Sequence, residues 1–454
     1  MALMKWGPAV ATDDVWRRLF RNLAYLGSAN AIVAFASIIT LAMVARALGP
    51  FALGILALIE AYVRSVDQLV RIEPWQGVIR YGTSALEGDR RKDFEQLVKF
   101  STLCDIVGGI VAALVAIGVA KFAANWLNFD GEQLSMVIWF SATLALGLSS
   151  TPTAILRLFD KFDVLAKISV ATALGRLVLT FVAWQAGSSL WTFVVLLMAY
   201  QVVEQTLPLV FAWRELYRRG HRGIWRQPLR GVVASHPRII QFIINANVNV
   251  VARTSVQRFD ILIVGALLGP SAAGLYHLAR RVGLVALRVG RPLQQAVYPD
   301  IARLWARGQV QRFRKVVLRV NVTLAAAAGL GLAAVAFFME DLVRLVFGEA
   351  FATAAPLMIV QVFAVTIFLG GITLNPALLS MGEDRTLVRI TLTATAVFFA
   401  ALFPLIDRFG ALGGCFAHVI FNAVWLAGCL TVFLRRTGAD QSSSLNTQAS
   451  SNGG

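Results

Sequence analysis

The sequence predicts an all-α integral membrane protein with about 12 transmembrane helices, in two six-helix lobes around a central cavity. The first observation is composition: the 454 residues are 57% hydrophobic and 15% charged, with a mean hydropathy of +0.68. Soluble domains are about 45–50% apolar and about 25% charged. The second is the recurrence of apolar stretches longer than the roughly 20 residues that cross a bilayer. The third is a turn motif that occurs once in each half of the chain.

The apolar stretches divide evenly between the two halves. Those of the first half lie at about 22–45, 51–70, 99–120, 133–156, 164–186 and 189–212, and those of the second at about 239–268, 272–297, 317–339, 354–380, 387–406 and 411–434. We therefore expect one lobe at 1–212, a basic linker at 213–238 and a second lobe at 239–434. The Ser-, Asn- and Gly-rich tail, 435–454, is expected to be disordered.

The charged connections predict the orientation. Thirty Lys and Arg residues fall in or beside the connections of one side, and only Arg46, Lys121, Arg344 and Arg408 on the other. Lys and Arg accumulate on the cytoplasmic side of membrane proteins. Both termini and the linker are therefore predicted to be cytoplasmic. The same bias explains why the linker is basic. The alternative explanation is that the linker binds anionic lipid or a cytoplasmic partner.

A short motif relates the two halves. Residues 45–58 (ARALGPFALGILAL) align with 265–278 (GALLGPSAAGLYHL) at one offset of 220 residues. Because six spans separate the copies, both have the same orientation, as in a parallel repeat about an axis along the membrane normal. The alternative is that LGPxxxG is only a favourable tight turn.

The hairpin formed by the seventh and eighth spans carries unusually many polar residues. Ionisable groups at membrane depth usually face a bundle interior or a watery cavity. The first arm has one polar face with helical spacing, formed by Asn245, Asn249, Arg253, Gln257 and Asp260. The second arm has a similar stripe formed by His277, Arg281, Arg288 and Arg291, beside Arg280. We interpret the pair as two walls of a wet, cationic cavity.

The second span carries a matching charged face. Glu60, Arg64, Asp67 and Arg71 lie at i, i+4, i+7 and i+11. At the offset of 220, Glu60 corresponds to Arg280, so opposite charges on equivalent helices are predicted to meet across the cavity. The alternative is pairing of Glu60 with Arg64 within the helix. Asp105, Arg176 and Glu204 are lone charges in other spans and are interpreted as structural pairs in preference to site residues.

Other classes of function lack sequence support. The net charge of +17 comes from residues between apolar spans, which does not predict a nucleic-acid partner. The three cysteines lie in apolar segments, and no metal-ligand spacing, nucleotide-binding loop or nucleophile motif is present. We therefore expect no catalytic residues, no metal, no cofactor and no enzyme activity.

Several segments carry a family resemblance. AILRLFDKFDVLA (154–166), PWQGVIRYGT (74–83), RFDILIVGALLGPSAAGLYHLAR (258–280) and FGEAFATAAP (347–356) resemble the polysaccharide-biosynthesis flippases of the multidrug/oligosaccharidyl-lipid/polysaccharide exporter superfamily. The resemblance extends to about residue 434. It implies a bacterial inner-membrane protein with two six-helix lobes. It also implies translocation of undecaprenyl-pyrophosphate-linked sugar units, such as those of O-antigen, capsule or exopolysaccharide, from the inner to the outer leaflet.

The expected site follows from the charge of that substrate. Guanidinium groups bind phosphate oxygens through a planar fork of donors, and amides exchange hydrogen bonds with sugar hydroxyls. The substrate-binding candidates are Arg253, Arg258, Arg280, Arg281, Arg288, Arg291, Asn245, Asn249 and Gln257. The alternative to substrate binding for Arg288 and Arg291 is that their side chains snorkel to the membrane interface. The alternative for Arg258 is a purely structural pair with Asp260.

Energy for transport is expected from a proton or sodium gradient. The candidates for ion coupling or gating are Asp67, Asp260, Glu60 and Arg64, with a permanent ion pair as the alternative for each aspartate. Expected partners are the lipid-linked glycan, membrane lipids, a glycan polymerase and glycosyltransferases. The alternative functions are a multidrug antiporter of the same superfamily, a membrane glycan polymerase or ligase, and a scaffold for glycosyltransferases.

Overall fold

The computed structural model describes residues 12–127, 129–148, 150–229, 232, 239–244, 247 and 256–451. Within these ranges it leaves out the side chains of 12–28, 256–258, 286, 288–293, 295, 296, 299 and 439–451. The described residues form helices and connections, without a strand. The fold class expected from the sequence is therefore confirmed.

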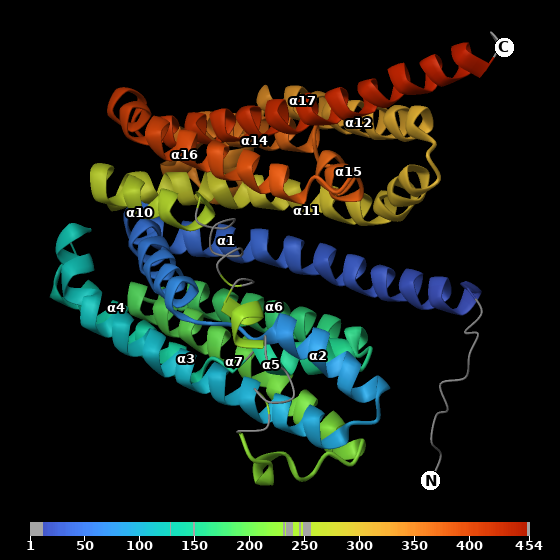
Figure 1. Ribbon diagram of the computed structural model, residues 1–454. Helices are drawn as coiled ribbons and strands as arrows, with labels where there is room; N and C mark the ends of the chain where they lie inside the picture. Colours follow the sequence, from blue (N-terminus) through green and yellow to red (C-terminus); the bar gives the residue numbers. More distant parts are fainter. Residues whose placement is uncertain are drawn as a thin grey trace.

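The first half of the chain contains seven α-helices and two short 3-10 helices in the described residues. They are α1 (Thr12–Val70), α2 (Trp75–Glu87), α3 (Arg91–Trp126), α4 (Gly131–Ala142), η1 (Thr143–Leu146), α5 (Ser150–Leu158), α6 (Phe162–Gln185), α7 (Leu190–Arg218) and η2 (Ile224–Arg226). The second half contains α10 (Val256–Leu268), α11 (Pro270–Ala306), α12 (Val310–Ala336), α13 (Met339–Phe347), η3 (Glu349–Ala354), α14 (Ala355–Leu369), α15 (Leu374–Ser380), α16 (Asp384–Phe409) and α17 (Ala411–Ser451). Figure 1 shows α2–α7 on one side of the long first part of α1 and α10–α17 on the other.

The helices agree with twelve predicted spans. Nine stretches of the described residues are long and apolar enough to cross a membrane, and one of them, Ala29–Val70, contains two helices joined at Gly49. The seventh span is described only in part, and the charged eighth span forms the continuous helix α11. The twelve-helix, two-lobe arrangement is consistent with these elements.

The two copies of the LGP motif have the same backbone conformation. Gly49 has φ 70° and ψ 176°, and Gly269 has φ 83° and ψ 175°. A positive φ strains residues with a Cβ atom but not glycine. The following proline then begins the next helix, where its missing N–H and fixed φ cost nothing. We call this end of the molecule the LGP end, and the end with the Lys- and Arg-rich connections the basic end.

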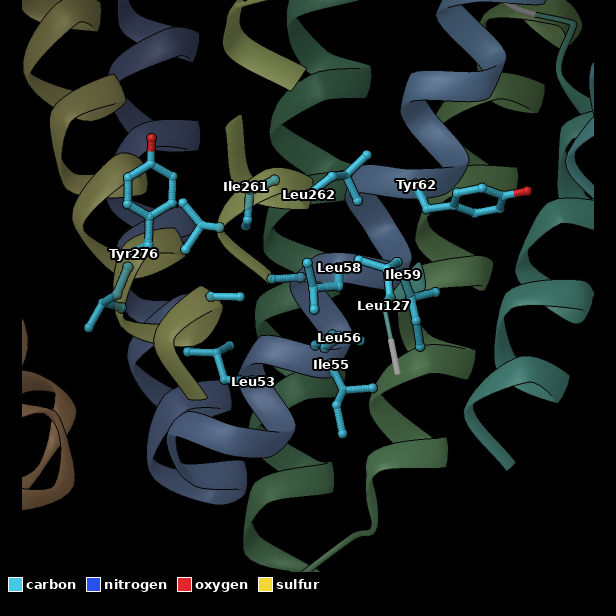
Figure 2. Packing of buried hydrophobic residues seen from close by; sticks show 14 of the residues in the cluster. Leu53, Ile55, Leu56, Leu58, Ile59, Tyr62, Leu127, Ile261, Leu262 and Tyr276 are labelled. Atoms are coloured by element: carbon cyan, nitrogen blue, oxygen red, sulfur yellow. The ribbon is translucent and has the colours of Figure 1, made fainter. Parts of the chain in front are cut away.

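The lobes meet in a reciprocal crossing near the LGP end. A Cβ atom on Gly54 would overlap the carbonyl oxygen of Pro270, and one on Gly274 would overlap that of Pro50. Only glycine allows the two backbones to approach this closely. Figure 2 shows the apolar cluster beside this crossing, in which α1 residues such as Leu58 lie near Ile261 and Tyr276 of the second lobe. The crossing and this shared core hold the lobes together.

The fourth span is interrupted in its middle. It consists of α4, η1 and α5, so carbonyl groups before the break and N–H groups after it lack partners within the helix. Arg71 donates hydrogen bonds to the carbonyl oxygens of Leu144 (2.8 Å) and Gly147. Asp105 accepts one from the Thr151 N–H at 2.7 Å. Arg71 thus caps the carbonyl end of the first piece, where the helix dipole favours a cation, and the Asp105 side chain satisfies an N–H group at the start of the second.

The C-terminal tail differs from expectation. The helix α17 continues to Ser451, although residues 435–454 were expected to be disordered. No proline follows Ala411, so nothing removes an N–H donor from the helical hydrogen-bond series of this segment.

Candidate functional site

A polar cavity of about 420 Å³ lies between the lobes. Spans from both halves line it: α1, α6 and α7 from the first, and α10 and α11 from the second. Its charged and titratable residues are Glu60, Arg64, Arg176, Tyr200, Glu204, Asp260, His277, Arg280 and Arg281. Glu60 lies ten residues, about 15 Å, beyond Pro50 along α1. The cavity is therefore on the basic side of the glycine crossing, where the two lobes are in backbone contact.

Glu60 joins the two lobes through an ion pair. Its carboxylate accepts a hydrogen bond from Arg64 Nε at 2.9 Å, one turn along α1. It also accepts hydrogen bonds from Nη2 of Arg281, on α11, at 3.1 and 3.2 Å. Both arrangements that the sequence suggested for Glu60 therefore occur together. The partner across the cavity is Arg281, one residue beyond the equivalent position Arg280.

Arg280 is bound to a different acid. Its Nε lies 2.8 Å from Oδ2 of Asp260, which is 1% exposed. The Tyr276 hydroxyl donates to the same oxygen at 2.9 Å, His418 Nε2 lies 2.9 Å from it, and the Ile261 N–H donates to Oδ1 at 2.8 Å. Both oxygens of Asp260 therefore have partners. This geometry matches a permanent ion pair that fixes α10, α11 and α17 together, the alternative given above for Asp260.

Asp67 does not line the cavity. Its carboxylate pairs with Arg71 at 2.6 Å, and Arg71 in turn caps the break in the fourth span. Asp67 and Arg71 thus lie on the part of α1 that faces the first lobe. Glu60 and Arg64, farther from the basic end, face the cavity.

Arg176 and Tyr200 are cavity residues that the sequence analysis did not select. The Arg176 guanidinium carbon lies 4.8 Å from the centre of the Tyr200 ring, a cation–π distance. Across the described part of the chain, the ion pairs of the cavity arginines involve Arg64, Arg280 and Arg281, and Arg176 makes none. The available signal was its position in the middle of an apolar span, which by itself marks a functional candidate.

Glu204 also lines the cavity, one helical turn after Tyr200 on α7. It is exposed, and its charge acts on the Tyr200 side chain. The cavity thus contains four arginines and three carboxylates, with one guanidinium, Arg176, resting on an aromatic ring. This arrangement can bind an anion, and an aromatic face beside it can contact a sugar ring.

The remaining predicted site residues fall outside the described parts. Asn245, Asn249 and Arg253 lie in segments that the structure does not describe. The backbones of Gln257, Arg258, Arg288 and Arg291 belong to α10 and α11, and their side chains lie outside the description. Their roles remain predictions. Among the described residues, no group of three or more His, Cys, Asp or Glu side chains has the geometry to hold a metal ion.

Comparison with known proteins gives one family and one fold. The family described as polysaccharide biosynthesis protein matches residues 43–356. Inner membrane protein YghQ of Escherichia coli strain K12 is 29% identical over 349 residues, which cover 76% of this chain and 97% of that protein.

Two solved structures have a similar fold. An inward-facing multidrug resistance MATE family transporter of the MOP superfamily has a TM-score of 0.67 and 14% identity, covering 97% of this chain and 98% of its own. The lipid II flippase MurJ, in an inward closed conformation, has a TM-score of 0.64 and 10% identity, covering 92% of this chain and 90% of its own. At these identities the likeness establishes the shared fold.

Proposed function

Because the chain belongs to the polysaccharide biosynthesis protein family, we propose that it moves an undecaprenyl-pyrophosphate-linked oligosaccharide from the inner to the outer leaflet. The observation that carries this proposal is the cavity between the lobes, in which Arg176 has no carboxylate partner among the described residues. The lipid-linked substrate of MurJ and the transporter fold support it. The chain is a multi-pass inner-membrane protein, as the name of the Escherichia coli relative and the apolar helices support.

The orientation assigned to the chain makes this conformation open toward the cytoplasm. The positive-inside rule places the basic end on the cytoplasmic side. The cavity lies on that side of the glycine crossing, where a lipid-linked sugar made in the cytoplasm can enter. Alternating access then requires the crossing of Gly54 and Gly274 to open and the basic end to close.

The arginines of the cavity have different roles in this proposal. Arg280 holds Asp260 and stays in the protein framework. Arg281 is bound to Glu60 through Nη2, so a phosphate that binds Arg281 competes with that carboxylate for its charge. Arg176 needs no such exchange and is the first ligand for the pyrophosphate, with Tyr200 beside it for the adjoining sugar. The lipid tail stays in the bilayer between the lobes.

The test is a flipping assay on Arg176. Purified protein is placed in liposomes with a fluorescent undecaprenyl-pyrophosphate sugar, and the accessibility of the label in each leaflet is followed. Arg176→Gln removes the charge and keeps a polar side chain of similar length. A hydrogen bond to a charged group contributes about 1.5–3 kcal/mol, so we expect flipping to slow by about tenfold to a hundredfold.

The matched control is Arg408→Gln, which removes an exposed arginine outside the cavity. It should flip at the parental rate. Equal rates in parent and Arg176→Gln would show that Arg176 does not bind the substrate. Efflux of a cationic dye by a parent that leaves the lipid-linked sugar in place would instead establish the multidrug antiporter.

The antiporter is the second candidate because the MATE transporter shares the fold. Glu204, exposed in the cavity, is the residue that would attract a cation. The cavity lining has four arginines and three carboxylates. This excess of positive charge repels cationic drugs and argues against the antiporter.

A further inference from the structure

Asp105 is a buried carboxyl group that lacks the arginine partner of its counterparts. Within the described spans, Glu60, Asp67 and Asp260 each pair with at least one arginine. Asp105 is 1% exposed and makes no such pair with a described residue. Among the described residues, its Oδ2 accepts a hydrogen bond from the Thr151 N–H at 2.7 Å, and its Oδ1 has no partner.

The neighbours of Asp105 are suited to a neutral carboxyl group. Among the described residues, the buried hydroxyl oxygens of Ser101 and Ser150 lack hydrogen-bond partners. Ser101 lies one helical turn before Asp105 on the same face of α3, and Ser150 and Thr151 begin α5. A protonated carboxyl group gains an O–H donor, and the side chain of Thr151, which interacts with Asp105, carries a hydroxyl oxygen that can accept it. An ionised carboxylate here would leave Oδ1 charged and unsatisfied, which is costly in a buried site.

The charged groups that act on Asp105 come from the end of α1 and the segment after it. They are Arg71 and Glu73, with the Cys104 thiol next to it on α3. The Arg71 guanidinium is occupied by Asp67 and by the carbonyl oxygens of Leu144 and Gly147. In this conformation Arg71 therefore binds the carbonyl groups at the break of the fourth span instead of the carboxyl group of Asp105.

We propose that Asp105 is a proton-binding site of the first lobe and carries the coupling proton of transport. In this conformation the proton is on Asp105. When its O–H bond breaks, the proton passes to water at the basic end, and the carboxylate that remains attracts Arg71 from the carbonyl groups of the break. Arg71 lies on the same helix as Glu60 and Arg64, so its movement shifts the cavity wall of α1. Proton release at Asp105 is thereby linked to the cavity.

The position of Asp105 fits exchange with the basic end. It lies six residues, about 9 Å, beyond Lys99 along α3. Lys99 Nζ donates hydrogen bonds to the carbonyl oxygens of Trp225 (2.8 Å) and Gln227 (2.7 Å) in the linker. The contact of Lys99 with the linker marks the boundary of the first lobe at the basic end. Asp105 lies little more than one and a half helical turns inside that boundary.

Infrared spectroscopy of the purified full chain tests proton binding directly. A protonated carboxyl group has a C=O stretch separate from that of a carboxylate. We expect the parent to show this band at neutral pH, Asp105→Asn to lack it, and Asp163→Asn, which changes a half-exposed aspartate paired with Lys167, to retain it. Asn keeps the size of the side chain and an acceptor for the Thr151 N–H, so the fold is preserved. Identical carboxyl bands in parent and Asp105→Asn throughout a pH titration would overturn the proposal.

Transport measurements test the coupling, which rests on the proposed function. In the flipping assay, a proton gradient should accelerate the parent and Asp163→Asn, and this stimulation should be lost in Asp105→Asn, which still binds the substrate. Stimulation that persists in Asp105→Asn would refute coupling through this residue. A parent that moves no lipid-linked sugar would refute the proposed function, while the infrared result would still decide whether Asp105 binds a proton.

Discussion

At the scale of single residues, the buried charges of this protein divide by what they are bound to. Asp260 has hydrogen-bond or ionic partners on α10, α11 and α17, whereas Arg176 faces the cavity without a carboxylate partner among the described residues. A charge whose partners are all provided by the protein stabilises the fold. A charge left without a partner beside a cavity is available to a ligand. Charged residues that line the same cavity therefore have different roles.

Removal of the Asp260 charge should destabilise the protein strongly. Asp260→Asn leaves the Arg280 guanidinium buried without its counter-charge. Breaking a buried ion pair on one side costs about 3–5 kcal/mol, so we expect a clearly lower Tm for the purified protein in detergent. Asp341→Asn, which changes an exposed aspartate, should leave Tm unchanged. Equal Tm values for the two variants would contradict a structural role for Asp260.

At the scale of the elements, the contact between α1 and α11 holds the lobes together at the LGP end, which the proposed function takes as the closed end of the cavity. Gly54 and Gly274 occupy equivalent positions in the two LGP repeats, and each contacts the proline carbonyl of the other copy. Near the same end, Arg46 of α1 donates hydrogen bonds to the carbonyl oxygens of Val346 (3.0 Å) and Leu345, at the C-terminus of α13. A cation there is favoured by the helix dipole. The first lobe thus holds the second at two points.

A side chain at Gly54 should prevent this closed conformation. In Gly54→Ala the new Cβ would overlap backbone atoms of Pro270, which have no alternative rotamer. We expect Ser37→Cys, at the cavity, to react with an impermeant thiol reagent added outside whole cells in Gly54→Ala, and to be protected in the parent background. Gly118→Ala is the control, because a Cβ there meets open space. Protection that persists in Gly54→Ala would show that the crossing does not close this end.

At the scale of the whole molecule, the linker between the lobes is docked on the first lobe. His221 Nδ1 lies 3.3 Å from Oε1 of Glu95, and Gln227 donates to Oε2 of Glu95 at 2.8 Å. Arg91, which pairs with Glu95, also donates to the carbonyl oxygen of Gly220. The described part of the linker therefore has defined contacts in addition to its positive charge.

This docking should weaken in mild acid. Burial lowers the pKa of His221 below its ordinary value of about 6.5. The folded protein then binds fewer protons at His221 than the unfolded chain does, so stability is complete above about pH 6.5 and falls as the pH drops toward the lowered pKa. Trypsin should cleave the linker faster as the pH falls through this range.

His221→Gln, which has no charge to gain, provides the control for that experiment. The pH dependence of its cleavage should be smaller than that of the parent once the activity of trypsin itself is corrected for. Identical pH profiles for the two proteins would show that His221 does not control the docking.

The sequence by itself determined the features of this protein that depend on local composition and periodicity. Hydropathy located the twelve spans, because a helix in lipid must satisfy its own backbone and present apolar side chains. The repeated LGPxxxG motif indicated the two equivalent turns, since only glycine adopts their backbone conformation without strain. Charges in the middle of the spans marked the residues that required an explanation.

Only the tertiary structure decided which partner each charge has. Glu60 and Arg281 are 221 residues apart in sequence, and Asp260 and His418 are 158 apart, so helical spacing cannot identify such pairs. The offset between the repeats suggested Arg280 for Glu60, but Arg280 pairs with Asp260, which also binds the Tyr276 hydroxyl. Arg176 and Asp105 gained their importance in the same way. A charge becomes available to a ligand or a proton when the packing of helices leaves it without a partner, and packing depends on the whole chain.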